Sequence, residues 1–134
     1  MWETAFGPLF RRLGFEPATW IDQPPPEFAR PPIFTVLGRD ADRRPAVFFI
    51  WYLETPDTRA LDYFAMVTRQ PPITTRPPFQ LAEAYYGLVV LAQNDRTWVD
   101  LVQARDLIPV TAYDIDLPRF LEILSSRHTP TGDR

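Results

Sequence analysis

The stretch Ala46–Glu54 reads AVFFIWYLE and carries apolar side chains on successive residues, not only on alternate ones. A strand with one face in water alternates apolar and polar residues, whereas a strand covered on both faces is apolar throughout. The apolar part is much shorter than the roughly 18 to 20 residues that cross a bilayer. The stretch therefore predicts a central strand covered on both faces. Because no apolar run is long enough to cross a bilayer, membrane insertion is not predicted.

Two further strand-like runs flank this one in the sequence, Ile33–Gly38 and Leu61–Thr68. Turn-forming residues separate the three runs, so they predict a three-stranded antiparallel meander. Later in the chain, 86–92 and 97–104 predict a hairpin whose turn is 94–96. The segment Leu107–Tyr113 predicts a sixth strand or an extended edge, limited by Pro109.

Helical spacing of apolar residues predicts an N-terminal helix over 3–14 and a C-terminal helix that begins after Asp116 as its N-cap. One or two helical turns are predicted within Phe79–Tyr85. Clustered prolines predict extended connectors over 15–32 and 70–78, for which binding to an SH3-type domain is the alternative interpretation. The tail 128–134 is predicted to be flexible and polar.

These elements predict a single α+β domain over residues 1–134. Its sheet is expected to be largely antiparallel, with five or six strands built from the meander and the hairpin, and with helices at both ends of the chain. The order of elements is similar to that of bacterial secretion chaperones. This resemblance concerns the order alone, because no sequence motif accompanies it.

Composition excludes several kinds of chemistry. The chain has no cysteine, no lysine and a single histidine, His128, next to its only two serines, Ser125 and Ser126. Thiol catalysis, Schiff bases, a Walker lysine and a tetrahedral zinc site are therefore excluded, and no cofactor is predicted. The neighbouring aspartates Asp40 and Asp42, and Asp114 and Asp116, are interpreted as turn and cap residues instead of cation ligands.

Carboxylates and tyrosine remain as possible acid–base groups. Asp62, Tyr63 and Asp100 lie on segments predicted as strands, where they could act on a small molecule bound by a curved sheet. A solvent-facing position or an arginine partner is the more ordinary role of such residues. A small-molecule binder or carboxylate enzyme is therefore the alternative hypothesis.

The leading hypothesis is a non-catalytic protein-binding component, such as an adaptor, a chaperone, an inhibitor or a small structural subunit of a larger bacterial or phage assembly. If helices cover only one sheet face, the other is left rich in aromatic residues for a partner protein or a second copy. Alternatively, the proline-rich connectors and the chain termini fold back and cover that face. The candidate partner-binding residues are Phe48, Ile50, Tyr52, Tyr63, Trp98, Arg43 and Arg44.

The charge pattern argues against nucleic-acid binding. The net charge is −3, all fourteen basic residues are arginine, and the densest group, Arg39 with Arg43 and Arg44, is interrupted by aspartates. Nucleic-acid affinity needs an uncompensated basic surface. It would require the fold to gather those three arginines with Arg69 and Arg76 on one face. The N-terminal residues lack the pattern of a signal peptide, so a cytoplasmic location is expected.

Overall fold

The computed structural model describes residues 2–128 and contains one five-stranded sheet. The strands are adjacent in chain order, so that β1 and β5 are the edges and β3 is the centre. Their bounds are Glu16–Ile21 for β1, Phe34–Arg39 for β2, Pro45–Leu53 for β3, Ala84–Leu91 for β4 and Ile108–Val110 for β5. The helices are α1 (Trp2–Leu13), α2 (Thr58–Arg69), the 3-10 turn η1 (Phe79–Leu81), α3 (Arg96–Gln103) and α4 (Leu117–His128).

The sheet is mixed, which corrects the expectation of a largely antiparallel one. β1, β2 and β3 pair antiparallel, as the meander predicts for its first two strands. β3 pairs with β4 and β4 with β5 in parallel, because α2 and α3 are the crossover connections between them. The α+β class is confirmed.

The segment Leu61–Thr68, predicted as the third meander strand, lies within α2. Its apolar side chains run almost without interruption from Leu61 to Val67, as in a buried strand, but the buried ones follow helical spacing. Asp57 begins the helix as its N-cap and accepts hydrogen bonds from the backbone N–H groups of Arg59 and Ala60. This helix replaces the predicted strand and also removes the similarity in element order to secretion chaperones.

The segment 97–104, predicted as the return strand of a hairpin, belongs mostly to α3. Asp95 was interpreted as a turn residue but is the N-cap of this helix, accepting a hydrogen bond from Thr97 N at 2.8 Å. The segment therefore leads from β4 through a crossover helix into β5.

The other predicted elements are present with small differences in their bounds. β2, β3, β4, α1 and α4 lie where the sequence predicts them, and Asp116 caps α4 by accepting from Arg119 N at 3.1 Å. β1 lies inside the proline-rich connector 15–32, with a bulge next to Pro17. An edge strand tolerates proline and bulges better than an inner strand does.

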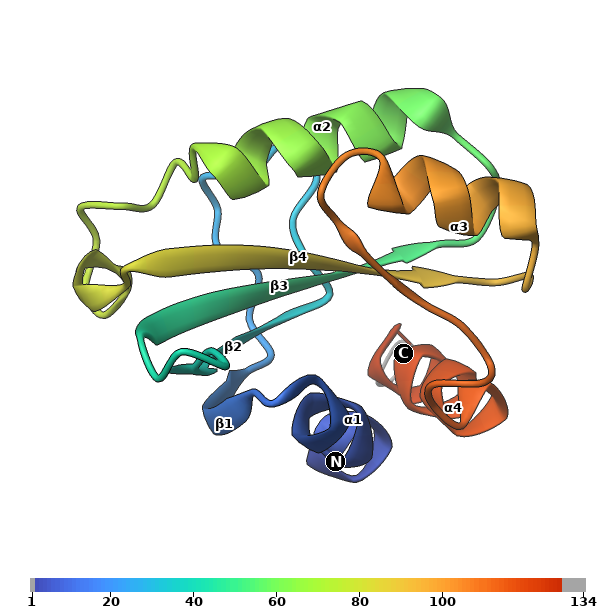
Figure 1. The fold of residues 1–134 in the computed structure, drawn as a ribbon, viewed down its shortest axis with the longest axis horizontal. Coiled ribbons are helices and arrows are strands. Elements are labelled where there is room, and N and C mark those ends of the chain that lie inside the picture. Colours follow the sequence, from blue (N-terminus) through green and yellow to red (C-terminus); the bar gives the residue numbers. More distant parts are fainter. Residues whose placement is uncertain (1, 129–134) are drawn as a thin grey trace, which may run out of the picture.

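Helices cover both faces of the sheet. Figure 1 shows α1 and α4 on one side and α2 and α3 on the other. Each side has its own buried cluster of apolar side chains, and β3 contributes alternate residues to both. The apolar stretch around β3 is therefore explained by core formation, as predicted for a central strand.

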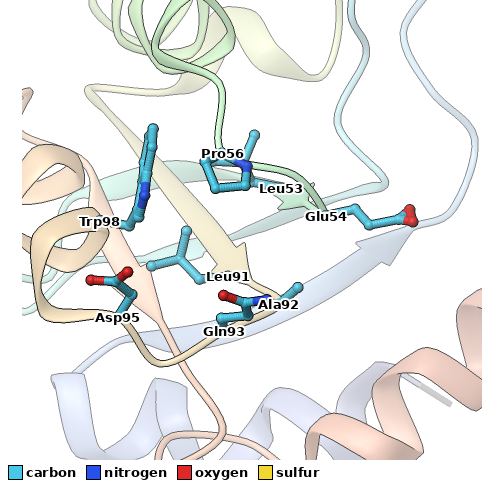
Figure 2. Close-up of a pocket in the computed structure, with 8 residues that line it drawn as sticks. All are labelled: Leu53, Glu54, Pro56, Leu91, Ala92, Gln93, Asp95 and Trp98. Carbon is cyan, nitrogen blue, oxygen red and sulfur yellow. The ribbon is translucent and has the colours of Figure 1, made fainter.

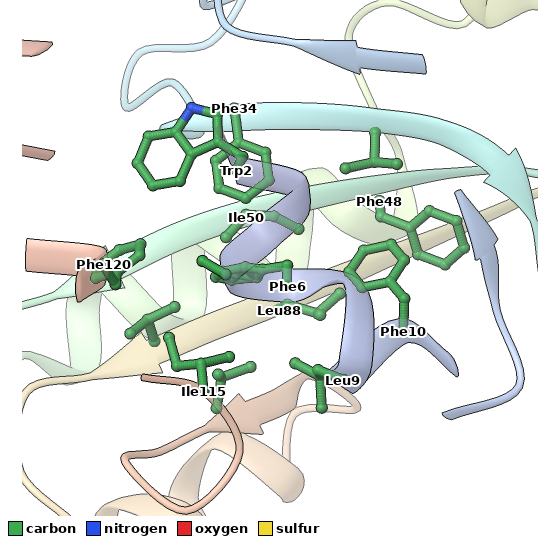
Figure 3. Packing of buried hydrophobic residues seen from close by; sticks show 14 of the residues in the cluster. Trp2, Phe6, Leu9, Phe10, Phe34, Phe48, Ile50, Leu88, Ile115 and Phe120 are labelled. Carbon is green, nitrogen blue, oxygen red and sulfur yellow. The ribbon is translucent and has the colours of Figure 1, made fainter. Parts of the chain in front are cut away.

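Figure 3 shows the cluster between the sheet and the helices α1 and α4, in which seven of the 17 buried residues are aromatic. Trp2 stacks on Phe34 with ring centroids 4.5 Å apart, and Phe6 meets the same ring edge-on at 5.1 Å. Phe120 of α4 closes the cluster against Phe6 and Trp2. The first and last helices are thus fixed against the sheet by contacts between residues far apart in the chain.

No helix within residues 2–128 is long and apolar enough to span a membrane. The predicted flexible tail begins at the last residue of α4 and otherwise lies outside the described residues.

Candidate protein-binding surface

The three candidate acid–base residues lie on helices, which corrects their predicted place on strands, and no two of them share a contact partner. Asp62 of α2 accepts a hydrogen bond from Arg105 at 2.7 Å, and Asp100 of α3 pairs with Arg96 at 3.2 Å. The hydroxyl oxygen of Tyr63 accepts from the backbone N–H groups of Ala29 and Arg30 at 2.8 and 3.3 Å. The contacts of Asp62 and Tyr63 tie α2 to other segments, whereas the pair of Asp100 and Arg96 is an exposed pair within α3.

The residues proposed for partner binding do not form one surface. Phe48 and Ile50 are fully buried in the core below α1, so the expectation that they lie on an open aromatic face is corrected. Tyr52, Tyr63 and Trp98 are half-buried on three different elements. Their burial follows from helices on both sheet faces.

The remaining two candidates, Arg43 and Arg44, lie in the turn between β2 and β3. The side chain of Arg43 is 79% exposed and that of Arg44 is 46% exposed. The side chain of Asp40 is fully buried and holds Arg44 in place. The Nε of Arg44 donates a hydrogen bond to Asp40 Oδ2 at 2.9 Å. Tyr86 of β4 donates to the same oxygen at 2.9 Å.

The other oxygen of Asp40 accepts from the backbone N–H groups of Asp42 and Arg44. Burial on its own raises the pKa of Asp40, but the hydrogen bonds from Arg44 and Tyr86 favour the charged form and hold the pKa below its ordinary value. Asp40 therefore organises the turn, as interpreted from the sequence.

The other acidic pair also serves turns and caps. Asp114 accepts from Thr111 N at 2.8 Å, while Asp116 caps α4. Within the described range no group of three histidine, cysteine, aspartate or glutamate residues is placed to hold a metal ion. Ser125 and Ser126 lie in the last turns of α4, and the side chain of His128 is outside the described residues.

Three of the five arginines required for a basic face are paired with carboxylates. Arg43 pairs with Glu16 at 3.9 Å, Arg44 with Asp40 at 2.8 Å and Arg76 with Glu27 at 2.9 Å. These pairs reduce the uncompensated charge on which nucleic-acid affinity depends.

A small hollow lies where the carboxyl ends of β3 and β4 meet the start of α3, as Figure 2 shows. Leu53, Pro56 and Leu91 form its apolar part, and Trp98 and Asp95 approach it from α3. Its volume of about 20 Å³ is enough for about one water molecule. Small-molecule sites are usually roughly 300 to 1,000 Å³, so this hollow is too small for an organic ligand.

A larger and open groove of about 540 Å³ lies between α3 and the segment that follows β5. We call it the Tyr113 groove. It is lined by Asn94, Arg96, Val99, Gln103, Pro109, Thr111, Tyr113 and Asp114. The side chain of Arg96 is 88% exposed at one end of α3.

Tyr113 is the most exposed large apolar residue of the described chain, at 83%. It lies in a turn closed by Thr111 and Asp114: Asp114 N donates to Thr111 O, and both the N–H and the hydroxyl of Thr111 donate to the Asp114 carboxylate. Tyr113 N donates to Thr111 Oγ1 at 3.2 Å. The turn is also tied to α1, since Arg12 forms an ion pair with Asp114. Tyr113 is therefore presented to solvent from a fixed backbone.

Tyr113 is not among the candidate residues predicted from the sequence, because it falls within the predicted strand or extended edge Leu107–Tyr113. The available signal was the spacing Thr111-x-x-Asp114 after Pro109, in which two side chains that bond to backbone groups bracket a turn. A large aromatic residue inside such a turn has no strand neighbour to cover it.

A third groove, of about 380 Å³, runs beside the end of β3 and the start of α2. Arg30 and Asp57 lie on it as an ion pair with a separation of 3.6 Å. Trp51 contributes its ring but is itself buried, and its indole N–H donates to Arg30 O at 3.1 Å. Arg30, Asp57 and the indole N–H of Trp51 are thus already paired within the protein.

Comparisons with known proteins give little further information. No protein-family model matches the sequence, and no curated protein matches it. The structure titled "Structure of EndoMS in apo form" is similar at 15% sequence identity with a TM-score of 0.41. The likeness covers 73% of this chain and 38% of that one. A likeness at this level carries no argument about function.

Proposed function

We propose that this protein is a non-catalytic protein-binding component whose partner contacts the Tyr113 groove. The observation that carries the proposal is Tyr113. It is 83% exposed, it lies on a turn that four hydrogen bonds and an ion pair hold in place, and it lines an open groove of about 540 Å³. A partner protein would cover this ring and remove its apolar surface from water.

The composition of the groove favours a protein partner. Tyrosine and arginine are enriched among the residues that contribute most binding energy at protein interfaces, and Tyr113 and Arg96 occupy this groove. Binding usually costs entropy because flexible groups become ordered. A tyrosine on a fixed turn has little backbone freedom to lose, so more of its contact energy contributes to affinity.

The alternative, a small-molecule binder or carboxylate enzyme, has less support. Small-molecule sites usually enclose most of their ligand, whereas the Tyr113 groove is open along the surface. Asp62 and Asp100, the carboxylates proposed for acid–base work, are paired with Arg105 and Arg96. An acid–base role of either carboxylate would compete with its ion pair.

The test is an affinity pull-down from the native cell with three forms of the protein, followed by quantitative mass spectrometry. Tyr113→Ala removes the exposed ring, and Leu81→Ala is the matched control because Leu81 is 70% exposed and does not line the groove. Loss of a central interface residue costs about 2 kcal/mol or more. We expect a specific protein to be recovered with the wild type and Leu81→Ala, and at least tenfold less of it with Tyr113→Ala.

Recovery of the same proteins in the same amounts with Tyr113→Ala would contradict the assignment to this surface. Light-scattering mass of the purified protein tests whether the partner is a second copy. In that case the wild type and Leu81→Ala would be dimers, whereas Tyr113→Ala would be a monomer.

A further inference from the structure

We infer that the groove beside the end of β3 takes a short extended segment of a partner protein, which pairs with β3 as an added strand. This groove of about 380 Å³ lies between the end of β3, the start of α2 and the residues Arg30, Pro31 and Ile33 before β2. We call it the β3-end groove. It shares no lining residue with the Tyr113 groove, so the inference goes beyond the proposed function.

The central strand β3 extends beyond its neighbour β2. β2 begins at Phe34, which pairs with Ile50, so Trp51–Leu53 are paired with a strand on the β4 side only. The residues that would continue β2 past this point include Pro31 and Pro32, and neither has an N–H to donate to β3. The end of β3 is therefore an open edge inside the sheet.

Three backbone groups of this edge point away from β4. Ala92 N donates to Leu53 O, so the planar peptide group between Leu53 and Glu54 has its C=O on the β4 side and the N–H of Glu54 on the opposite side. Alternation along the strand places the N–H and C=O of Tyr52 on that same side, as it does those of Ile50, which face β2. None of the three groups has a hydrogen-bond partner in residues 2–128.

The order of these groups favours an extended chain over other occupants. A donor, an acceptor and a second donor lie in one row, which is the pattern of a strand edge, and a second extended backbone is its complement. The charged and indole groups of the groove are already used, because Arg30 pairs with Asp57 and the Trp51 N–H donates to Arg30 O. An anionic small molecule would have to break the pair of Arg30, whereas a peptide backbone uses only groups that have no partner.

The walls of the groove indicate which side chains the segment carries. Trp51 and Leu53 face the buried cluster below α2, and Ala60 and Phe64 of that helix line the same groove. Side chains directly opposite one another on paired strands point to the same face of a sheet. We therefore expect apolar side chains at two positions of the segment, separated by one residue, opposite Trp51 and Leu53.

The outer edges of the sheet are less suited to strand addition. β1 carries Pro17 next to a bulge, and Pro109 is the middle residue of β5. Proline and bulges interrupt the row of donors that an added strand needs. The stretch from Trp51 to Glu54 contains no proline, so its row of backbone groups is complete.

The test uses two substitutions of one residue. Glu54→Pro removes one of the three backbone groups, whereas Glu54→Ala keeps the N–H and removes only the carboxylate. A phage library of random 12-residue peptides is panned on the immobilised wild type after depletion on Glu54→Pro, and enriched peptides are synthesised with a fluorescent label. Anisotropy should show equal affinity for the wild type and Glu54→Ala, and at least tenfold weaker binding to Glu54→Pro. Melting temperatures of the three proteins show that each is folded.

A second measurement needs no variant. Hydrogen exchange of the wild type, followed at single residues by NMR, should become slower at the N–H groups of Tyr52 and Glu54 when an enriched peptide is bound, and stay the same at that of Tyr113. The inference is overturned if no peptide is enriched, if Glu54→Pro binds as tightly as the wild type, or if the peptide leaves the exchange of Tyr52 and Glu54 unchanged. The pull-down with Tyr113→Ala tests the proposed function separately, because Tyr113 does not line the β3-end groove.

Discussion

Asp40 shows how a single buried charge can be accommodated in this protein. Its carboxylate has no exposed surface, yet four hydrogen bonds reach its two oxygens, two from backbone N–H groups and two from Arg44 and Tyr86. The backbone bonds shape the turn between β2 and β3. The bond from Tyr86 connects that turn to β4, so one side chain joins three strands.

We expect Asp40→Asn to lower the melting temperature by several degrees. Both carboxylate oxygens accept hydrogen bonds, whereas the asparagine NH2 group can only donate and would face the donors of Arg44 and Tyr86. Differential scanning calorimetry measures the change. Asp42→Asn is the control, since the Asp42 side chain is 80% exposed in the same turn, and it should melt close to the wild type.

The stability that Asp40 contributes should depend on pH. Its folded-state pKa is below the ordinary value of 3.8, so the unfolded chain binds a proton first as the pH falls. The contribution is complete above about pH 5 and is lost as the pH falls through the ordinary pKa towards the lower folded one. Urea unfolding at pH 7, 4 and 3 should show the gap between wild type and Asp40→Asn narrowing. A gap that stays constant would exclude this linkage.

Some residue roles could be predicted from the sequence, and others depended on the tertiary structure. The turn role of Asp40 and the cap role of Asp116 follow from local spacing, and both are confirmed. Phe48 and Ile50 were assigned to a surface because the sequence does not state how many helices cover the sheet. Tyr113 was missed because its exposure depends on a turn that ends a very short strand.

At the scale of elements, a run of apolar residues on successive positions correctly predicted the strands that are covered on both faces. β3 and β4 are apolar on successive residues because they lie between two helical layers, and both were predicted. α3 has only eight residues, so few of them carry the helical spacing. α2 is as long as α1 and α4, but between Leu61 and Val67 its only charged residue is Asp62, so the run resembles a buried strand. The N-caps Asp57 and Asp95 were the signals that distinguished helix from strand.

The cap of α3 can be tested separately. Asp95→Ala leaves the N–H of Thr97 without its acceptor and should lower the free energy of unfolding by about 1 kcal/mol. Asp95→Asn keeps an oxygen at the same position, so its unfolding free energy should remain near that of the wild type. Equal losses for alanine and asparagine in urea unfolding would show that the cap is not the cause.

At the scale of the whole molecule, the sheet has two edges, and each carries a proline. Pro17 lies in β1 next to a bulge, and Pro109 is the middle residue of β5. An open edge is a template on which other chains can pair, and prolines and bulges interrupt the necessary row of donors. The edges therefore oppose sheet-to-sheet association, which leaves the Tyr113 groove and the β3-end groove as the proposed contacts.

Replacement of the proline in β1 should weaken this protection. Pro17→Val adds a backbone N–H and a side chain with high strand propensity to the edge. We expect its light-scattering mass to rise with protein concentration more than that of the wild type. Pro72→Val, in the exposed loop after α2, should not show this rise. Equal masses for the two variants at every concentration would argue against edge protection by Pro17.

The central position of β3 has a kinetic consequence. β3 pairs antiparallel with β2, which is close to it in sequence. It also pairs in parallel with β4, from which the crossover helix α2 separates it in sequence. Contacts between residues close in sequence form with a smaller loss of chain entropy, so hairpin pairing should precede the parallel pairing in folding. β3 would then be the folding nucleus on which the parallel half assembles. Conservative truncations in β3 should slow refolding, whereas those in β5 should mainly accelerate unfolding.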